Sequence, residues 1–502
     1  MTEFLAAGKQ MGGERPWAKD GGVYFGFGVS PAKAPPQQSI LDEAWDITPR
    51  HSNLYPNPDD GENRGEGHLV TIGPNGSGKT RRLLIPNLYR LVNWSAVVID
   101  IKGELAALTA AHRAAQSGHS VLVIDPFAVM AKNYPKLVEK YPFLRSNGFN
   151  PVTALDPKND DFPDDAMALA EALVRVEGSE PHWSQSAQDL VAALIMYVRL
   201  SKPNVGSLAD VRAILGEPAA DFRVSVRAML VKGIEEDCEE LTIKAGRFSE
   251  VTSDNKELNS VISTALTQTR WLDSRPIKAD LAKGHFDFAS LKEKPVTVYL
   301  ILPPRYLATH STWLRVLITS CLMPLLRSVD GAKVPVLFML DEFAQLGTMK
   351  AIEDNVALMR GYGLKLWLIL QDLSQVQSLY KERWESFIGN AGVVQSFAPQ
   401  DVTTRDYLSK LSGQRLYWLK TGGTSNSANM GHQHSHSTGS SETDQYLPGP
   451  IFWPQGLAAM DIGQAVLFSR GRCVRTWLPD PEQEDDALGI RRAMQKAKNE
   501  SS

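Results

Sequence analysis

The sequence predicts an α/β fold: a largely parallel sheet whose chain is interrupted by an inserted helical segment. Between residues 68 and 125, short runs rich in β-branched residues alternate with helix-like stretches. From about 157 to 285 the apolar residues recur with helical spacing, and strand-like runs then return between 296 and 469. Strands that alternate with helices are typical of parallel sheets with crossover helices. The first and last thirds of the chain are therefore expected to form one α/β domain.

The expected strands are short apolar runs, most of them followed by a turn or a helix-like segment. We expect strands at HLVTI (68–72), SAVVIDI (95–101), SVLVID (120–125), VTVYLIL (296–302), VPVLFML (334–340), LKLWLIL (364–370), VVQSF (393–397) and AVLFS (465–469). Helical spacing of apolar residues predicts helices over 79–92, 103–118, 164–176 and 184–200.

These patterns divide the chain into five kinds of segment. A lead-in rich in Gly, Pro and charge covers 1–67, and a charged tail covers 481–502. The nucleotide-binding domain is expected in two pieces, 68–156 and 286–480, on either side of an all-α insertion at 157–285. A low-complexity stretch at 421–445 has almost no apolar residue to anchor it and is expected to be a flexible surface loop.

Composition is that of a soluble globular protein of more than one domain. The 502 residues are 43% apolar and 22% charged, and the net charge of −4 gives no overall attraction to nucleic acid. The three cysteines are far apart and odd in number, which favours a reducing cytoplasm over a disulfide framework. No run reaches the roughly 18 to 20 apolar residues that a spanning helix needs. The most apolar run (313–326) contains a proline and an arginine and is interpreted as a buried helix.

A phosphate-binding loop is the clearest chemical motif in the chain. TIGPNGSGKT (71–80) stands between an expected strand and an expected helix, the context in which such a loop cradles phosphates. Its glycines let successive N–H groups point inward, Lys79 would reach the β/γ-phosphates, and the Thr80 hydroxyl would hold Mg²⁺. The candidate nucleotide-binding residues are Gly73, Pro74, Asn75, Gly76, Ser77, Gly78, Lys79 and Thr80.

An acidic pair follows another buried strand. Seven apolar residues in VPVLFML run directly into Asp341 and Glu342, so the pair is expected where α/β sheets bind ligands. Asp341 can hold Mg²⁺ through its water shell, and Glu342 can act as the base that activates the attacking water. The alternative is a solvated acidic turn, which the phosphate loop elsewhere in the chain disfavours.

Two further polar residues are weaker candidates for the same reaction. Gln371 follows the strand LKLWLIL, where its amide could bond the γ-phosphate or the water; capping of the strand end is the alternative. Arg360 precedes that strand and could act from a neighbouring subunit as an arginine finger. An ordinary surface arginine is the alternative, and the residues alone favour it.

Taken together, the motifs resemble the TraG/TraD-like type IV secretion coupling proteins, which are conjugative DNA-transfer ATPases. The matching runs are HLVTIGPNGSGKT, SAVVIDIKGEL (95–105), FNPV (149–152), HWSQSAQDLVAALI (182–195), VTVYLILPP (296–304), LFMLDEFAQLG (337–347) and MRGYGLKLWLILQDLSQ (359–375). They occur in order, and the resemblance covers roughly residues 65 to 480.

The resemblance implies a RecA-like P-loop NTPase core with an inserted all-α domain, working as a homo-hexamer with ATP and Mg²⁺. Implied partners are single-stranded DNA, a relaxase or other secreted protein, and channel components of a type IV secretion system at the inner membrane. By motif position Lys79, Thr80, Asp341 and Glu342 keep their roles, Gln371 becomes a γ-phosphate sensor and Arg360 a finger in trans.

One departure and two rival functions follow. The family usually begins with transmembrane helices, whereas about 70 residues without a spanning segment precede this phosphate loop. Either this is a soluble relative or its anchor lies on another chain, so a cytoplasmic chain held at the inner membrane through partners is expected. The first rival is a receptor or adaptor that recruits protein cargo, with the nucleotide as a switch. The second is a DNA motor of the FtsK or helicase kind, unconnected to secretion.

Overall fold

The structure is a computed structural model that describes most of the chain. It covers residues 67–481 apart from 177–180, 250–255, 328–331 and 430–434, together with two short strands at 27–29 and 49–50 and three isolated positions, 491, 495 and 499. The expected lead-in (1–67) and charged tail (481–502) therefore lie almost entirely outside the described residues.

An 11-stranded sheet forms the centre of the molecule, in the order β2-β1-β13-β12-β9-β3-β8-β7-β4-β6-β5. The seven strands from β9 to β5 are parallel, and four of them are buried at every residue. Burial on both faces explains why they appear in the sequence as unbroken apolar runs. These strands are β3 (His68–Ile72), β4 (Ser95–Asp100), β5 (Ser120–Ile124), β6 (Val296–Ile301), β7 (Val336–Leu340), β8 (Leu364–Leu370) and β9 (Ala391–Phe397).

The sheet continues beyond β9 with antiparallel strands. β12 (Gln464–Ser469) pairs with β9 and with β13 (Arg472–Trp477), and β1 (Phe27–Val29) and β2 (Pro49–Arg50) complete that edge. Only β12 is among the strands that the sequence predicts. β1 and β2 are two or three residues long, too short for periodicity to reveal, and β13 has charged residues between its apolar ones.

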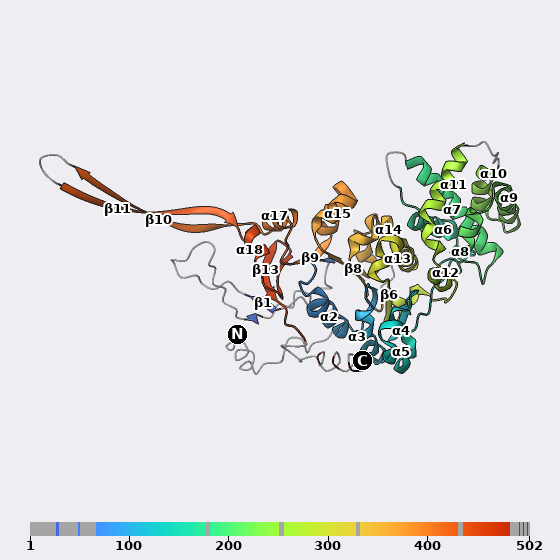
Figure 1. Ribbon diagram of the computed structural model, residues 1–502, viewed down its shortest axis with the longest axis horizontal. Helices are drawn as coiled ribbons and strands as arrows, with labels where there is room; N and C mark the ends of the chain where they lie inside the picture. Colours follow the sequence, from blue (N-terminus) through green and yellow to red (C-terminus); the bar gives the residue numbers. More distant parts are fainter. Residues whose placement is uncertain are drawn as a thin grey trace.

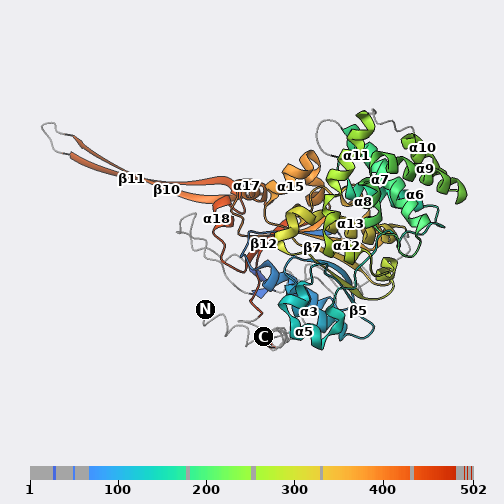
Figure 2. The same ribbon diagram turned by 45° about the vertical axis from the view of Figure 1, so that its right-hand side comes forward.

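Helices cover both faces of the sheet, α3 (Glu104–Ala114) on one and α13 (Pro304–Leu326) on the other (Figures 1 and 2). The run from Trp313 to Leu322 of α13 is buried throughout, as expected for a buried helix, because α13 also packs against α6. The remaining helices outside the insertion include α2 (Ile85–Arg90), α4 (Val129–Asn133), α5 (Pro135–Lys140), α14 (Lys350–Glu353), α15 (Leu373–Tyr380), α16 (Glu385–Gly389), α17 (Val402–Leu411) and α18 (Pro454–Ala458).

Every described element between Phe162 and Leu281 is a helix, which confirms the predicted all-helical insertion. The long helix α7 lies at its centre, in contact with α6, α8, α9, α10 and α11, and its side chains from Ala187 to Ile195 are buried except at Asp189. The helices are α6 (Phe162–Leu173), α7 (Pro181–Ser201), α8 (Leu208–Leu215), α9 (Ala219–Glu235), α10 (Glu239–Ser249), α11 (Lys256–Gln268) and α12 (Arg275–Leu281), gathered at the right of Figure 1.

The flexible loop expected over 421–445 requires correction. Strands β10 (Gln414–Asn429) and β11 (Ser435–Pro450) pair along their whole length, from Gln414 with Pro450 to Asn429 with Ser435. This hairpin projects far from the rest of the molecule in both views (Figures 1 and 2). In a two-stranded ribbon the inward backbone groups pair across the strands and the outward ones face solvent, so the ribbon forms without an apolar alternation that a sequence pattern could reveal.

Within the parts of the chain that the structure describes, none of the helices has the length and apolar character to cross a membrane.

Candidate active site

The loop at 73–80 joins the end of β3 to a helix that begins at Lys79. Gly76 and Gly78 have positive φ (80° and 92°), a backbone conformation that side-chain-bearing residues rarely adopt. The loop is fixed to the neighbouring strand at its start, because the Gly73 N–H donates to Leu370 O at 3.0 Å. The sequence therefore folds here into a tight turn with Asn75 and Gly76 exposed and Lys79 buried.

The Lys79 ammonium occupies the hollow of this loop. It donates to the Gly73 carbonyl and to Pro74 O, the latter at 3.1 Å. Burial lowers the pKa of Lys79, and the negative charges of Asp341 and Glu342 act in the opposite direction. The Ser77 hydroxyl of the same loop is buried without a hydrogen-bond partner. A buried cation and an unsatisfied donor in one loop fit an anion such as a phosphate.

The acidic pair lies where the sequence predicts it, directly after β7. Glu342 has left-handed backbone (φ 54°, ψ 40°), a conformation that costs a non-glycine residue about 1–3 kcal/mol and persists only where the surroundings hold it. Its N–H donates to Asp341 Oδ1 at 3.1 Å. Burial raises the pKa of Asp341 to about 6, the charge of Glu342 adds to the rise, and Lys79 opposes it. A cation beside Asp341 would relieve this cost, so the carboxylate fits a magnesium ligand.

Gln371 lies beside Glu342 across two adjacent parallel strands. β7 and β8 are neighbours in the sheet, so the residues that follow them meet at its carboxyl edge. Gln371 Nε2 donates to Glu342 Oε2 at 2.8 Å. The structure thus brings Lys79, Asp341, Glu342 and Gln371 to one edge of the sheet, with Thr80 half-buried next to Lys79 at the start of the helix.

Arg360 is not part of this group. It lies in the turn Met359–Tyr362 and is exposed, at the amino end of β8, whereas Gln371 follows the carboxyl end. A seven-residue strand spans about 20 Å, so Arg360 is on the opposite edge of the sheet from the phosphate loop of its own chain. Any action of Arg360 on a nucleotide requires a second subunit.

Two contacts near the loop have no signature in the sequence. Arg82 Nη1 donates to Leu478 O at 2.6 Å, and Arg81 forms an ion pair with Asp480 at 3.1 Å. The helix after the phosphate loop is therefore tied to the segment that follows β13. Because about 400 residues separate these partners, no local spacing could have revealed them.

The carboxyl end of β4 contributes Lys102, whose positive charge opposes the rise in the Asp341 pKa. Asp100 orders this turn, since its carboxylate accepts the N–H of Lys102 at 3.3 Å and of Ala106 at 2.8 Å. The sequence pattern marked the Lys-Gly-Glu run after this strand but gave it no role.

The segment after Glu342 contacts the helical insertion. The buried guanidinium of Arg315 donates to Leu346 O and to Ala172 O, both at 3.2 Å, and so bridges the turn after the acidic pair and the end of α6. Lys350 and Glu171 add an ion pair at 2.6 Å between the same two regions. These contacts therefore connect the segment after the acidic pair to the helical insertion.

Solved structures of conjugative coupling proteins share this fold. The bacterial conjugative coupling protein TrwBdeltaN70 superposes with a TM-score of 0.59 at 14% identity, covering 82% of this chain and 85% of that one. The plasmid coupling protein TrwB in complex with ADPNP gives 0.57 at 15% identity, covering 93% and 96%. TrwB in complex with ADP and Mg²⁺ gives 0.57 at 14%, covering 84% and 86%. The shared architecture is the RecA-like P-loop NTPase core with an all-helical domain.

Curated sequences agree with the structural likeness. The conjugal transfer protein TraG of Escherichia coli is 26% identical over 410 residues, covering 78% of this chain and 61% of the relative. The protein VirD4 of Agrobacterium fabrum is 26% identical over 413 residues, covering 80% and 57%. The chain thus spans about three fifths of the length of these relatives. Residues 52–473 match the family described as type IV secretory system conjugative DNA transfer, and the chain belongs to that family.

Proposed function

We propose that this protein is a Mg²⁺-dependent ATPase that drives single-stranded DNA, with a bound relaxase or other protein cargo, into a type IV secretion channel. The observation that carries the proposal is the convergence of Lys79, Asp341, Glu342 and Gln371 at one edge of the sheet. The TrwB structures with ADP and Mg²⁺ and with ADPNP support the choice of cofactors. The TraG and VirD4 relatives support the transfer role.

Each residue has a chemical part in this reaction. The loop N–H groups and the Lys79 ammonium bind the β/γ-phosphates, which replace the carbonyls that the ammonium contacts in this structure. Thr80 and Asp341 would hold Mg²⁺, which would neutralise phosphate charge when bound. The Glu342 carboxylate accepts a proton from the attacking water. Gln371 donates a hydrogen bond to that carboxylate and so orients the carboxylate.

We propose further that the protein works as a homo-hexameric ring with nucleotides between subunits. In this arrangement Arg360 acts as a finger on the nucleotide of the neighbouring subunit, which its position on the far edge of the sheet supports. The helical insertion (157–285) and the two α/β pieces (68–156, 286–480) are the proposed functional units. In this proposal, channel components hold the ring at the cytoplasmic face of the inner membrane; the match to the type IV secretory system family supports a place beside the channel.

The test is ATP hydrolysis by the purified protein with and without single-stranded DNA. Hydrolysis that requires Mg²⁺ and rises with DNA is the expected result. Hydrolysis indifferent to DNA would contradict the translocation role and leave a nucleotide switch.

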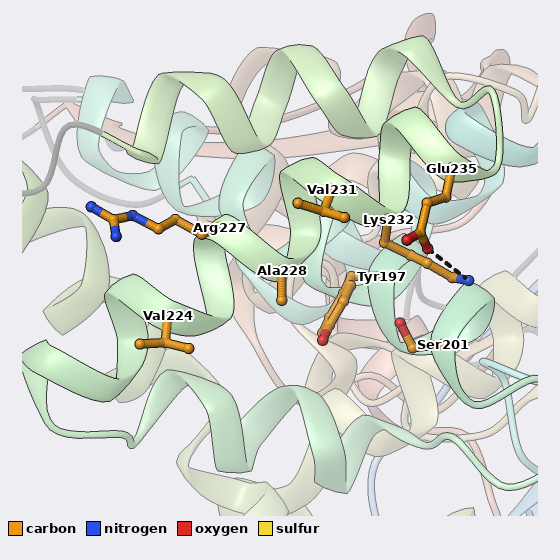
Figure 3. Close-up of a pocket in the computed structure, with 8 residues that line it drawn as sticks. All are labelled: Tyr197, Ser201, Val224, Arg227, Ala228, Val231, Lys232 and Glu235. Carbon is orange, nitrogen blue, oxygen red and sulfur yellow. Dashed lines mark ion pairs between the residues drawn. The ribbon is translucent and has the colours of Figure 1, made fainter.

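A groove in the helical insertion favours one second candidate, a nucleotide-switched receptor for protein cargo. The groove, of about 460 Å³, lies between α7 and α9, and its apolar side chains Val224 and Val231 are 66% and 52% exposed. Figure 3 shows Ala228, Val231 and Tyr197 gathered at its centre and the Lys232–Glu235 ion pair (3.6 Å) at one end. Exposed apolar side chains around a groove are typical of protein docking surfaces. Cargo binding that depends on nucleotide, without DNA-stimulated hydrolysis, would favour this candidate.

A further inference from the structure

His68 is a buried histidine that makes two directed hydrogen bonds. It is 2% exposed and is the first residue of β3, the strand that leads into the phosphate loop. Its Nδ1 accepts the N–H of Leu366 in β8 at 3.1 Å, and its Nε2 lies 2.5 Å from Val356 O. A carbonyl can only accept, so Nε2 carries the proton and the ring is the neutral tautomer.

The two bonds connect three segments that meet at the amino edge of the sheet. One is β3 itself, one is β8, and the third is the segment that carries Val356 and continues through the turn Met359–Tyr362 to Arg360. The Val356 N–H donates to Ile352 O at 2.8 Å, and the Val356 carbonyl accepts the hydrogen bond from the imidazole. Beside the β3–β8 ladder, His68 is thus a side-chain link between the Arg360 segment and the strand that ends at the phosphate loop.

Burial and nearby positive charges act together on the His68 ring. Burial lowers the pKa of His68, and the positive charges of Lys365 and Arg360 lower it further, while the bond to Val356 opposes them. Lys365 lies against the Trp94 ring at 5.4 Å from its centroid, and its own pKa is lowered to about 8 by burial. The lowered pKa favours the neutral ring, in which Nε2 donates to Val356 O.

We infer that His68 is a positioning residue for the reaction in trans. It fixes the position of the segment that bears Arg360, so that the arginine reaches the nucleotide bound to a neighbouring subunit. The inference rests on the proposed function, because Arg360 acts only between subunits. The competing explanation is that His68 merely packs at the start of β3 and supports the phosphate loop of its own chain.

Mixed rings separate the two explanations. A Lys79→Ala subunit cannot hydrolyse ATP itself and contributes only its Arg360; an Arg360→Ala subunit contributes only its phosphate loop. In the parent mixture, activity therefore comes only from interfaces that join the two. His68→Asn keeps an acceptor near the Nδ1 position but cannot reach Val356 O, whereas His68→Gln keeps a donor near the Nε2 position. The matched pair changes which of the two bonds survives.

The experiment measures ATP hydrolysis after subunit exchange, with exchange verified by fluorescence transfer between labelled subunits. His68→Asn in the Lys79→Ala subunit should lower activity on the order of ten- to a hundredfold, the scale expected when a catalytic group is displaced by about 1 Å. The same change in the Arg360→Ala subunit should lower it far less, and His68→Gln in the Lys79→Ala subunit should restore most of the activity.

Two other outcomes would contradict the role of His68, and one of them would also contradict the action of Arg360 in trans. Equal losses in both subunits, or equal losses with Asn and Gln, would make His68 a support of β3 and overturn the inference. A parent mixture that exchanges subunits and shows no activity would contradict the role of Arg360 in trans, and with it the role of His68. Melting temperatures of the two His68 variants, compared with the parent chains, show whether a loss reflects unfolding.

Discussion

The side-chain amide of Gln371 donates a hydrogen bond of 2.8 Å to the carboxylate of Glu342. The two residues follow adjacent parallel strands, β8 and β7, so the sheet itself fixes their separation. The bond leaves the other carboxylate oxygen of Glu342 available for a water. In this account Gln371 acts through Glu342, by orienting the base.

This relationship predicts the behaviour of Gln371 variants. Gln371→Ala should slow ATP hydrolysis by about ten- to a hundredfold with little change in nucleotide affinity, because the base loses its orientation. In a Glu342→Gln background the same change should have little further effect, since coupled residues are not additive. This expectation is checked by measuring ATP turnover for the parent, the two single variants and the double variant. Fully additive losses would show that Gln371 acts independently of Glu342.

The raised pKa of Asp341 predicts that the stability of the nucleotide-free protein depends on pH. Burial raises its pKa from an ordinary 3.8 to about 6, so the folded protein binds this proton more tightly than the unfolded chain does. The ionised carboxylate therefore destabilises the nucleotide-free fold above about pH 6, at an upper bound of ~2–3 kcal/mol, and has no effect below about pH 4.

Asp341→Asn should accordingly raise the melting temperature of the nucleotide-free protein at pH 7.5 and leave it unchanged near pH 4. With Mg²⁺ and nucleotide added at pH 7.5, the variant should gain less stability than the parent, because it has lost a metal ligand. Asp160→Asn, at an exposed position in the loop before α6, is the matched control and should change neither value. A variant less stable than the parent at neutral pH without nucleotide would contradict the burial argument.

Arg360 should matter for hydrolysis and not for binding. Arg360→Ala is expected to bind ATP almost normally and to hydrolyse it about a thousandfold more slowly, the usual contribution of an arginine finger. Arg360→Lys should not restore the rate, because an ammonium cannot bond two phosphate oxygens with fixed geometry. Measurement of nucleotide affinity and turnover for the two variants decides the matter. Normal turnover of Arg360→Ala would show that Arg360 is an ordinary surface arginine, the alternative that the sequence alone favours.

Single-stranded DNA should bind with a strong salt dependence and little base preference. A channel that moves any sequence must contact mainly phosphates, and such contacts release counterions. With four phosphate contacts, affinity would fall about fiftyfold between 50 and 200 mM salt. Fluorescence anisotropy with homopolymers of each base measures both properties. Affinity independent of salt would favour the cargo-receptor candidate.

The sequence predicted the parallel strands well because they are buried on both faces. β3 and β8 occupy the expected residues, and β4, β5, β6, β7, β9 and β12 differ by one or two positions at an end. Apolar runs of this kind have few alternative structures, and adjacent parallel strands bring whatever follows them to one edge. For this reason the meeting of Lys79, Asp341, Glu342 and Gln371 was also accessible from the sequence.

What escaped prediction depends on contacts between distant residues or on the backbone alone. The β10–β11 hairpin is held by backbone pairing, and its Ser-, Thr- and Gly-rich composition is also that of loops. The bonds from Arg82 to Leu478 and from His68 to Val356 join residues hundreds of positions apart. The location of Arg360 on the far edge follows from strand direction, but its use by a neighbour depends on an assembly that one chain does not specify.

Steady-state ATP hydrolysis by Glu342→Gln and by the parent protein, with Mg²⁺ and single-stranded DNA present, tests the proposed role of Glu342 most directly. The amide keeps the shape of the side chain but cannot accept the proton of the water. We expect unchanged nucleotide binding and hydrolysis slower by at least about a hundredfold. Near-normal hydrolysis by Glu342→Gln would show that the carboxylate bonded to Gln371 is not the base, and would contradict the proposed active site.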